Sequence, residues 1–512
     1  MSQTFQVSTP GERLRQRKVL AGVCLASAAM PMTFTGPAVA LRDIAQALGG
    51  SPVALAWVTN AFMLAFGSCL MVAGALADRH GRRRLFMAGL LLFVGASTAL
   101  VAAPSLLLFD LLRAVQGVAG AAIFAGGASA LAQEFAGRAR LQAFSLLGTS
   151  FGLGLTLGPI AAGGLTAAFG WRAIFVLVIA CAVVSWALAR CSMHESRDPQ
   201  AQALDWPGAI SFTAALTLFT CGVLEAPALG WAHPGTLWML LGALTLLALF
   251  VRIERRAQRP MLDLTLFRYP RFVGVQLLAA APAYAYVVLL VLLPIRFIGV
   301  EGVPVGEAGR WMMALSAPLV VLPLVAGWLA RRFAPASICG AGLLMAAAGL
   351  VWLSQVGGGS RALLPMALIG VGISLPWGLM DGLAVSVVPS ERAGMATGIF
   401  STTRVAGEGL ALALVGALLS ALTAQQLAGA GAYAPAAALA AQELAAGNLQ
   451  AAAALLPGQA LATVLRAYDA AFATLMLVLA AITVLTAVVV FVFLRRGADV
   501  EQRGLMPLAQ NQ

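Results

Sequence analysis

The chain has 512 residues, of which 61% are hydrophobic and 10% are charged, with a formal net charge of +12. Charged side chains are too scarce to cover the surface of a water-soluble protein of this length, so the composition excludes that class. The sequence pI of about 10.4 does not indicate nucleic-acid binding, because the positive charge lies in short segments between apolar runs.

Apolar runs of about 20 residues recur along the chain, and each is long enough to cross a bilayer as a helix. The sequence therefore predicts an all-α integral membrane protein with 14 transmembrane helices. The polar start, residues 1–16, predicts no removable signal peptide. The expected spans are residues 18–41, 55–77, 85–103, 105–130, 142–168, 172–190, 206–226, 235–254, 272–296, 308–330, 337–356, 362–386, 394–420 and 469–494.

The lysines and arginines predict the orientation of these spans. An even number of spans places both termini on one side of the membrane. With that side taken as cytoplasmic, 24 of the 32 basic residues lie in cytoplasmic segments, 6 lie on the opposite side, and Arg113 and Arg404 lie inside spans. Basic residues concentrate in cytoplasmic loops, so the bias predicts that both termini are cytoplasmic.

A short charged loop after the second span is the most informative motif. It reads Gly-Ala-Leu-Ala-Asp-Arg-His-Gly-Arg-Arg-Arg over residues 74–84. This loop resembles the signature loop between helices 2 and 3 of the major facilitator superfamily of transporters, whose eight specified positions are all met. The resemblance implies that the loop latches the cytoplasmic side in the outward-open state. The implied gating residues are Gly74, Asp78, Arg79, Gly81, Arg82 and Arg83.

A weaker copy of this loop, residues 327–333, ends the tenth span and lacks the aspartate. The repeat predicts two six-helix bundles with an inserted helix pair, similar to the fourteen-helix branch of drug:proton antiporters. In that architecture the substrate site lies near the midplane between the bundles. The expected parts are a cytoplasmic tail (1–17), the first bundle (18–190), a linker with two additional spans (191–271), the second bundle (272–494) with an external loop (423–468), and a second cytoplasmic tail (495–512).

The fifth span contains a glycine–proline pattern that favours a bendable helix packed closely on its neighbours. It resembles the antiporter motif of the superfamily, Gly-x-x-x-Gly-Pro-x-x-Gly-Gly, through Gly154, Gly158, Pro159 and Gly163. Ala162 departs from the pattern. The resemblance implies an exporter rather than an importer.

The fourth span contains Arg113 in an Arg-x-x-Gln-Gly setting that the family shares. A buried arginine is costly unless it is paired. Asp110 lies three residues earlier on the same helix face and is the nearest candidate partner. We expect Arg113 to act on a nearby protonated carboxylate; for Asp110, a static ion pair is the favoured interpretation.

Three charged residues fall deep inside the twelfth and thirteenth spans: Asp381, Arg404 and Glu408. From the cytoplasmic loop 389–394, Asp381 lies about 12 Å and Arg404 about 15 Å into the membrane at ~1.5 Å per residue. Charges at this depth are expensive and usually functional. We expect this group to couple protons or bind substrate, and the alternative is a salt bridge between the two spans.

The first span departs from the fourteen-helix antiporters, which carry an aspartate where this chain has Thr33 and an asparagine where it has Ala38. The coupling acid is therefore expected in the second half. Thr33, Thr35 and Gln116 are polar candidates for the cavity wall. A central Arg404 favours an anionic or zwitterionic substrate over a lipophilic cation.

Together these features predict a proton-coupled exporter of a small organic molecule, such as a drug, an antibiotic or a siderophore, in the bacterial inner membrane. A proton symporter that imports a metabolite is the alternative. An enzyme is not expected, because no nucleophile constellation or nucleotide loop is present, and the cysteines and histidines show no metal-site spacing. The predicted partners are the substrate, protons and lipid, without nucleic acid, cofactor or metal, and the protein is expected to be a monomer.

Overall fold

The computed structural model describes residues 10–135, 137–197, 205–257, 262, 264–386 and 393–505. Within this part of the chain every regular element is a helix, and 14 helical segments are long and apolar enough to cross a membrane. The predicted number of spans and the all-α fold class are confirmed. The loop at residues 389–392, used above to place Asp381 and Arg404 by depth, lies outside the described residues.

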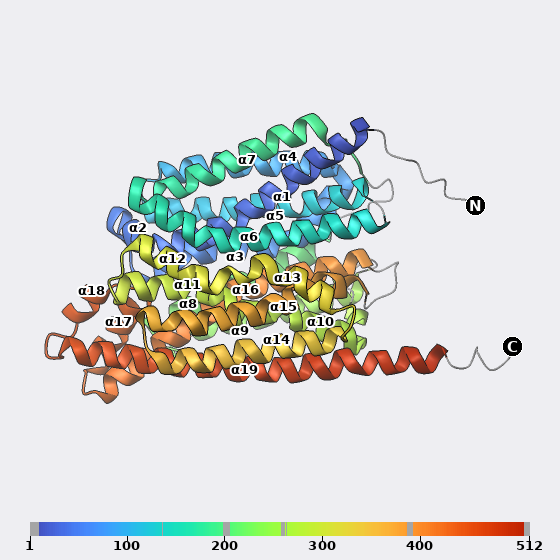
Figure 1. Cartoon of the computed structure of the whole chain (residues 1–512). Coiled ribbons are helices and arrows are strands. Elements are labelled where there is room, and N and C mark those ends of the chain that lie inside the picture. Colours follow the sequence, from blue (N-terminus) through green and yellow to red (C-terminus); the bar gives the residue numbers. More distant parts are fainter. Residues whose placement is uncertain are drawn as a thin grey trace.

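In the first bundle, α3 packs against α5 and α1 packs against α6. Figure 1 shows this bundle in blue to cyan above the second bundle. Its six helices are α1 (Pro10–Val39), α3 (Pro52–His80), α4 (Arg82–Val101), α5 (Leu106–Glu134), α6 (Gly137–Phe169) and α7 (Arg172–Ser192).

The second bundle contains more interrupted helices. The ninth span changes from α-helix to π-helix twice, and the tenth is divided at Ala317, before Pro318. Its spans consist of α10 (Pro270–Pro282), η2 (Ala283–Val287), α11 (Val288–Pro294) and η3 (Ile295–Val300), then α12 (Val305–Ser316) and α13 (Pro318–Leu329), α14 (Pro335–Val356), η4 (Gly359–Ala362) with α15 (Leu363–Ser386), α16 (Ala393–Gly429), and α19 (Leu461–Leu505).

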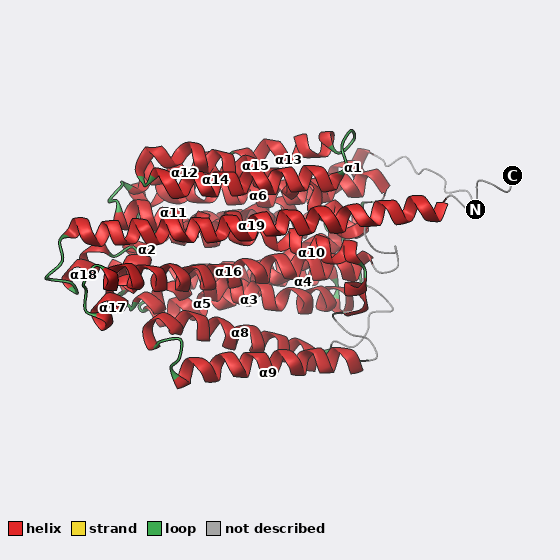
Figure 2. Ribbon diagram, turned by 90° about the horizontal axis from the view of Figure 1, so that it is seen from below, coloured by secondary structure: helices red, strands yellow, loops and turns green. Residues whose placement is uncertain are grey.

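The two additional spans, α8 (Trp206–Leu229) and α9 (Pro234–Arg256), form a hairpin beside the bundles. Figure 2 shows them along one edge of the molecule. α8 packs on α3 of the first bundle and on α16 of the second, so it bridges the two. A short 3-10 helix, η1 (Leu264–Arg268), precedes the second bundle.

The sequence fixes several helix boundaries through local chemistry. Ser51 and Ser105 cap α3 and α5 by accepting hydrogen bonds from backbone N–H groups three residues later, at 3.2 and 3.4 Å. Gly81 and Gly170 have φ of 113° and 80°, a backbone conformation that is unfavourable for residues with a Cβ atom. Each glycine makes a tight turn between consecutive spans. The turn between α3 and α4 thus requires a glycine at position 81 of the charged loop.

The start of α1 and the end of α19 lie at the same end of the molecule, which we call the terminal end (Figure 1). Two short helices, α17 (Ala434–Ala445) and α18 (Leu449–Ala454), lie at the opposite, distal end, as does α2 (Leu41–Leu48). The segment 423–468, expected to be an external loop, is mostly helical. One face of α17 is buried at the helical spacing Ala437, Ala440, Ala441 and Leu444.

The distal helices are held closely against both bundles and the additional hairpin. The Gln442 side chain in α17 donates a hydrogen bond to the Pro227 carbonyl oxygen of α8, at 2.9 Å. Gly447 has φ of 81°, and a Cβ added there would lie 3.0 Å from Cγ2 of Ile295 and 3.1 Å from its carbonyl oxygen. This turn approaches η3 so closely that a side chain would not fit without movement.

Candidate functional site

The deep charges of the second half gather where the two bundles meet. Nη1 of Arg404 lies 3.4 Å from Oδ1 of Asp381, so α15 and α16 are joined by the salt bridge that was the alternative interpretation of these charges. Glu408 follows one turn later in α16, is fully buried, and neither of its carboxylate oxygens has a hydrogen-bond partner among the residues that the structure describes. A Cβ added to Gly148 of α6 would lie 3.4 Å from Oδ2 of Asp381, so the first bundle faces this group.

Three aromatic rings surround the Arg404 guanidinium, and the sequence did not predict them. Cζ lies 5.3 Å from the ring centroid of Phe151, 5.9 Å from that of Trp377 and 5.8 Å from that of Phe400. Aromatic faces attract guanidinium groups, which lowers the cost of burying this charge. Phe151 belongs to the first bundle and the other two rings to the second, so the cluster spans the interface.

Arg113 lies inside the first bundle, but its partners differ from the predicted one. Its Nε donates to the Val58 carbonyl oxygen of α3 at 2.7 Å, and its Nη1 donates to Oε1 of Gln116 at 2.5 Å. Gln116 in turn donates to Ser97 of α4 at 2.8 Å. Oδ1 of Asp110 is buried and has no hydrogen-bond partner among the described residues. No hydrogen bond joins Asp110 to Arg113 there, and the arginine instead donates to one carbonyl oxygen of α3 and to Gln116 of its own helix.

The antiporter-motif glycines divide their contacts between two neighbours. A Cβ on Gly154 or Gly158 would collide with α1, at the Ala28 carbonyl oxygen and at Thr35 respectively. Gly163 faces the other bundle, where an added Cβ would lie 2.9 Å from the Val305 carbonyl oxygen of α12. The motif thus allows α6 to pack tightly on α1 and also on the opposite bundle.

The polar candidates for the cavity wall lie within the first bundle. Thr33 and Thr35 are fully buried, and their hydroxyls donate to carbonyl oxygens of their own helix, at 2.6 and 3.0 Å. Gln116 is fully buried in the Arg113 network. In this conformation these three residues stabilise helix packing.

The charged loop forms a compact cluster at the terminal end. Asp78 accepts hydrogen bonds from Arg82, with Nη2 at 2.9 Å, and Arg82 also donates to Gln133 of α5. In the first turn of α4, the N–H groups of Arg83 and Arg84 donate to the carboxylate of Glu195, at 3.2 and 3.1 Å. Glu195 supplies the acid at this helix N-terminus, and no motif identified it.

The remaining gating residues pack less closely against the rest of the protein. Arg79 is exposed, while Arg83 donates to the Arg190 carbonyl oxygen at 3.2 Å. A Cβ added to Gly74 would meet no atom within 4 Å, so no described helix packs closely on this glycine in this conformation.

The bundles touch each other from the distal end to the centre. At the centre, the Thr156 hydroxyl donates to the Ser316 carbonyl oxygen at 2.8 Å. Nearer the distal end, Gly163 and Gly309 approach so closely that a Cβ on Gly163 would lie 3.2 Å from the Gly309 Cα. These contacts describe a conformation closed at the distal end.

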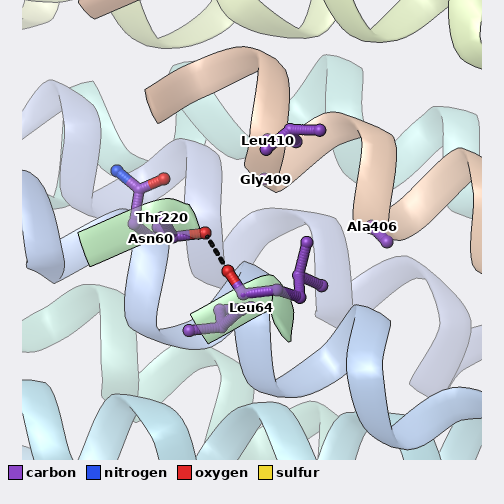
Figure 3. Close-up of a pocket in the computed structure, with 7 residues that line it drawn as sticks. Asn60, Leu64, Thr220, Ala406, Gly409 and Leu410 are labelled. Atoms are coloured by element: carbon purple, nitrogen blue, oxygen red, sulfur yellow. Dashed lines mark hydrogen bonds between the residues drawn. The ribbon is translucent and has the colours of Figure 1, made fainter. Parts of the chain in front are cut away.

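The second seam between the bundles runs along α3 and α16. A Cβ on Gly67 would lie 2.7 Å from Cα of Ala406, and α8 covers this seam. Figure 3 shows the crevice where the three helices meet; it leaves no room for a water molecule. It is therefore a packing seam and not a substrate site. Its lining residues include Asn60, Leu64, Thr220, Ala406, Gly409 and Leu410.

Two six-helix bundles with buried charges at their interface define a membrane transporter of the two-bundle, alternating-access type. The family model described as Major Facilitator Superfamily matches residues 21–412, and the chain belongs to that family. The predicted family resemblance is thereby confirmed.

Curated relatives and solved structures agree with this assignment. The chain is 31% identical to the multidrug resistance protein Stp of Mycobacterium tuberculosis over 75% of this chain and 72% of that protein. It is 28% identical to the tetracenomycin C resistance and export protein of Streptomyces glaucescens, over 80% and 78%. The structure of a bacterial homolog of the human lysosomal transporter Spinster, inward-facing and unoccupied, matches with a TM-score of 0.63 and 17% identity, over 95% of this chain and 98% of that one.

Proposed function

We propose that this chain exports small organic molecules by alternating access, in exchange for protons. The relatives named for multidrug resistance and for export of tetracenomycin C support this function. Their names favour drugs and antibiotics as substrates over the siderophores that the sequence also suggested. The family membership and the glycine–proline helix α6 agree with an exporter.

The observation that carries the proposal is the buried charge cluster at the bundle interface. Asp381 pairs with Arg404, whereas neither carboxylate oxygen of Glu408 has a hydrogen-bond partner within the described part of the chain. A carboxylate inside a membrane protein is an expensive charge, and binding a proton removes it. The two acids are thus suited to take up a proton in one conformation and release it in the other.

The rocking motion would open the distal contacts and close the terminal end. Gly163 and Gly309 lie on the seam that separates, and the Asp78–Arg82 loop lies where the latch would form. The excess of basic residues near the terminal end supports a cytoplasmic position for both termini. With bacterial relatives, this favours the inner membrane, where a monomer would suffice because both bundles belong to one chain.

Drug accumulation in intact cells tests the direction of transport. Cells that produce the protein should accumulate less of an exported compound than cells without it, and a protonophore should abolish the difference. Higher accumulation in the producing cells would contradict export and favour the symporter alternative. A difference that survives the protonophore would contradict proton coupling.

A further inference from the structure

The first bundle places an aromatic ring on an arginine of the second bundle. Phe151 of α6 lies with its ring centroid 5.3 Å from Cζ of Arg404, and the Phe151 side chain is 1% exposed. Trp377 and Phe400 enclose the same guanidinium from within the second bundle. Flat rings stack well on the planar guanidinium group. The guanidinium thus has one ring contact that must break whenever α6 moves away.

Two hydrogen-bond donors beside this ring contact are unused. Nε of Arg404 and Nε1 of Trp377 are buried and have no partner among the described residues, and Asp381 occupies only Nη1 of the arginine. The Trp377 ring also contacts Tyr286, at a centroid distance of 6.2 Å, and the Tyr286 hydroxyl is buried with no partner in the described part of the chain. Buried N–H groups are normally paired, so the unpaired Nε of Arg404 and Nε1 of Trp377 mark this cluster as a candidate binding site.

The backbone near Tyr286 has an unusual geometry that supports this interpretation. Tyr286 lies in the π-helical turn η2, which interrupts the ninth span between Pro282 and Val288. Single π-helical turns within helices occur frequently at functional sites. This turn places the Tyr286 ring against Trp377, on the side of the cluster formed by the second bundle.

We propose that a planar aromatic molecule carrying carbonyl or phenolic oxygens replaces Phe151 on the face of Arg404 when the bundles separate. This assignment rests on the proposed transport function and gives its substrate class. The ring system would stack on the guanidinium, and one of its oxygens would accept a hydrogen bond from Nε1 of Trp377. Asp381 can remain on Nη1 throughout. A non-planar cation would gain neither contact and would be repelled by the arginine.

Binding of 1,8-dihydroxyanthraquinone to the full-length protein in nanodiscs, measured by equilibrium dialysis, tests this assignment. Phe151→Leu removes the internal competitor and keeps apolar volume, so it should lower Kd about three- to tenfold. Phe175→Leu is the matched control, because Phe175 is equally buried but contacts Phe109 and Trp171 rather than Arg404. It should leave Kd unchanged. A Kd for Phe151→Leu that equals or exceeds the wild-type value would overturn the proposal.

A second variant keeps the test decisive if Phe151→Leu does not fold. Trp377→Phe keeps an aromatic ring and removes one donor, so the folded variant should bind the anthraquinone about five- to tenfold more weakly. An unchanged Kd would overturn the proposal. Wild-type protein that exports another drug in exchange for protons but does not bind the anthraquinone would refute the substrate class alone. Anthraquinone binding that follows the predicted pattern, without proton-linked export, would support the site and refute the proposed function.

Discussion

Substitution of Gly163 by alanine should shift the protein toward a conformation open at the distal end. The added Cβ would lie 2.9 Å from the Val305 carbonyl oxygen and 3.2 Å from the Gly309 Cα, both in the opposite bundle. Forcing one methyl group into a packed contact typically costs about 1–3 kcal/mol. The cost applies only while the bundles touch here, so the equilibrium should shift about 5- to 150-fold toward the separated state.

Gly164 provides the matched control for this prediction. It is the next residue in α6, and a Cβ added there would meet no atom within 4 Å. Gly164→Ala should therefore leave the equilibrium unchanged, although both variants gain the same methyl group and the same helix propensity.

Cysteine labelling measures the shift. Ser316 is fully buried beside Thr156, and Ser316→Cys in a background without the six native cysteines should react slowly with a membrane-impermeant maleimide added from outside. Adding Gly163→Ala should accelerate this reaction and adding Gly164→Ala should not. Equal labelling rates in the two alanine variants would refute the idea that the Gly163 contact holds the distal end closed.

Two further predictions concern the ends of the molecule. Asp78→Asn removes the partly exposed ion pair with Arg82, which is worth at most about 1 kcal/mol, so thermal unfolding should change little. The transport rate should fall if the loop is a latch, and unchanged transport would reduce the loop to a topology signal. Gly447→Ala should lower the free energy of unfolding by about 2–4 kcal/mol, from a left-handed backbone and a crowded Cβ. Gly431 also has a positive φ, but a Cβ added there would meet no atom within 4 Å, so Gly431→Ala should lower the free energy of unfolding by only about 1–2 kcal/mol. Equal losses of unfolding free energy in the two variants would contradict the close contact of Gly447 with η3.

The number of spans and the family could be predicted because hydropathy and the charged loop are local properties of the sequence. The contacts of the site could not, because they depend on which helices meet. Asp110 was assigned to Arg113 from helical spacing, yet the Val58 carbonyl oxygen of a neighbouring helix takes the arginine's Nε. Phe151 looked like one more apolar residue of its span, and only the packing of α6 on the second bundle brings it to Arg404.

The distal helices illustrate a signal that was present in the sequence but weak. Ala437, Ala440, Ala441 and Leu444 follow the spacing of one helix face, and all four are buried in α17. Alanine buries little apolar surface, so the pattern stands out poorly from an alanine-rich loop. Glu195 gave no signal, since its role depends on where the segment after α7 returns to α4.

Proton-driven uptake in everted membrane vesicles tests the central claim most directly. Wild-type protein should be compared with Asp381→Asn and Glu408→Gln, using a compound that intact cells are found to export. Glu443→Gln, an acid of the distal helix α17 that accepts from Asn448, is the control and should retain uptake. We predict that proton-driven uptake is lost in at least one of the Asp381 and Glu408 variants, while gradient-independent exchange of labelled for unlabelled compound persists there. Full proton-driven uptake in both variants would contradict the assignment of proton coupling to this cluster.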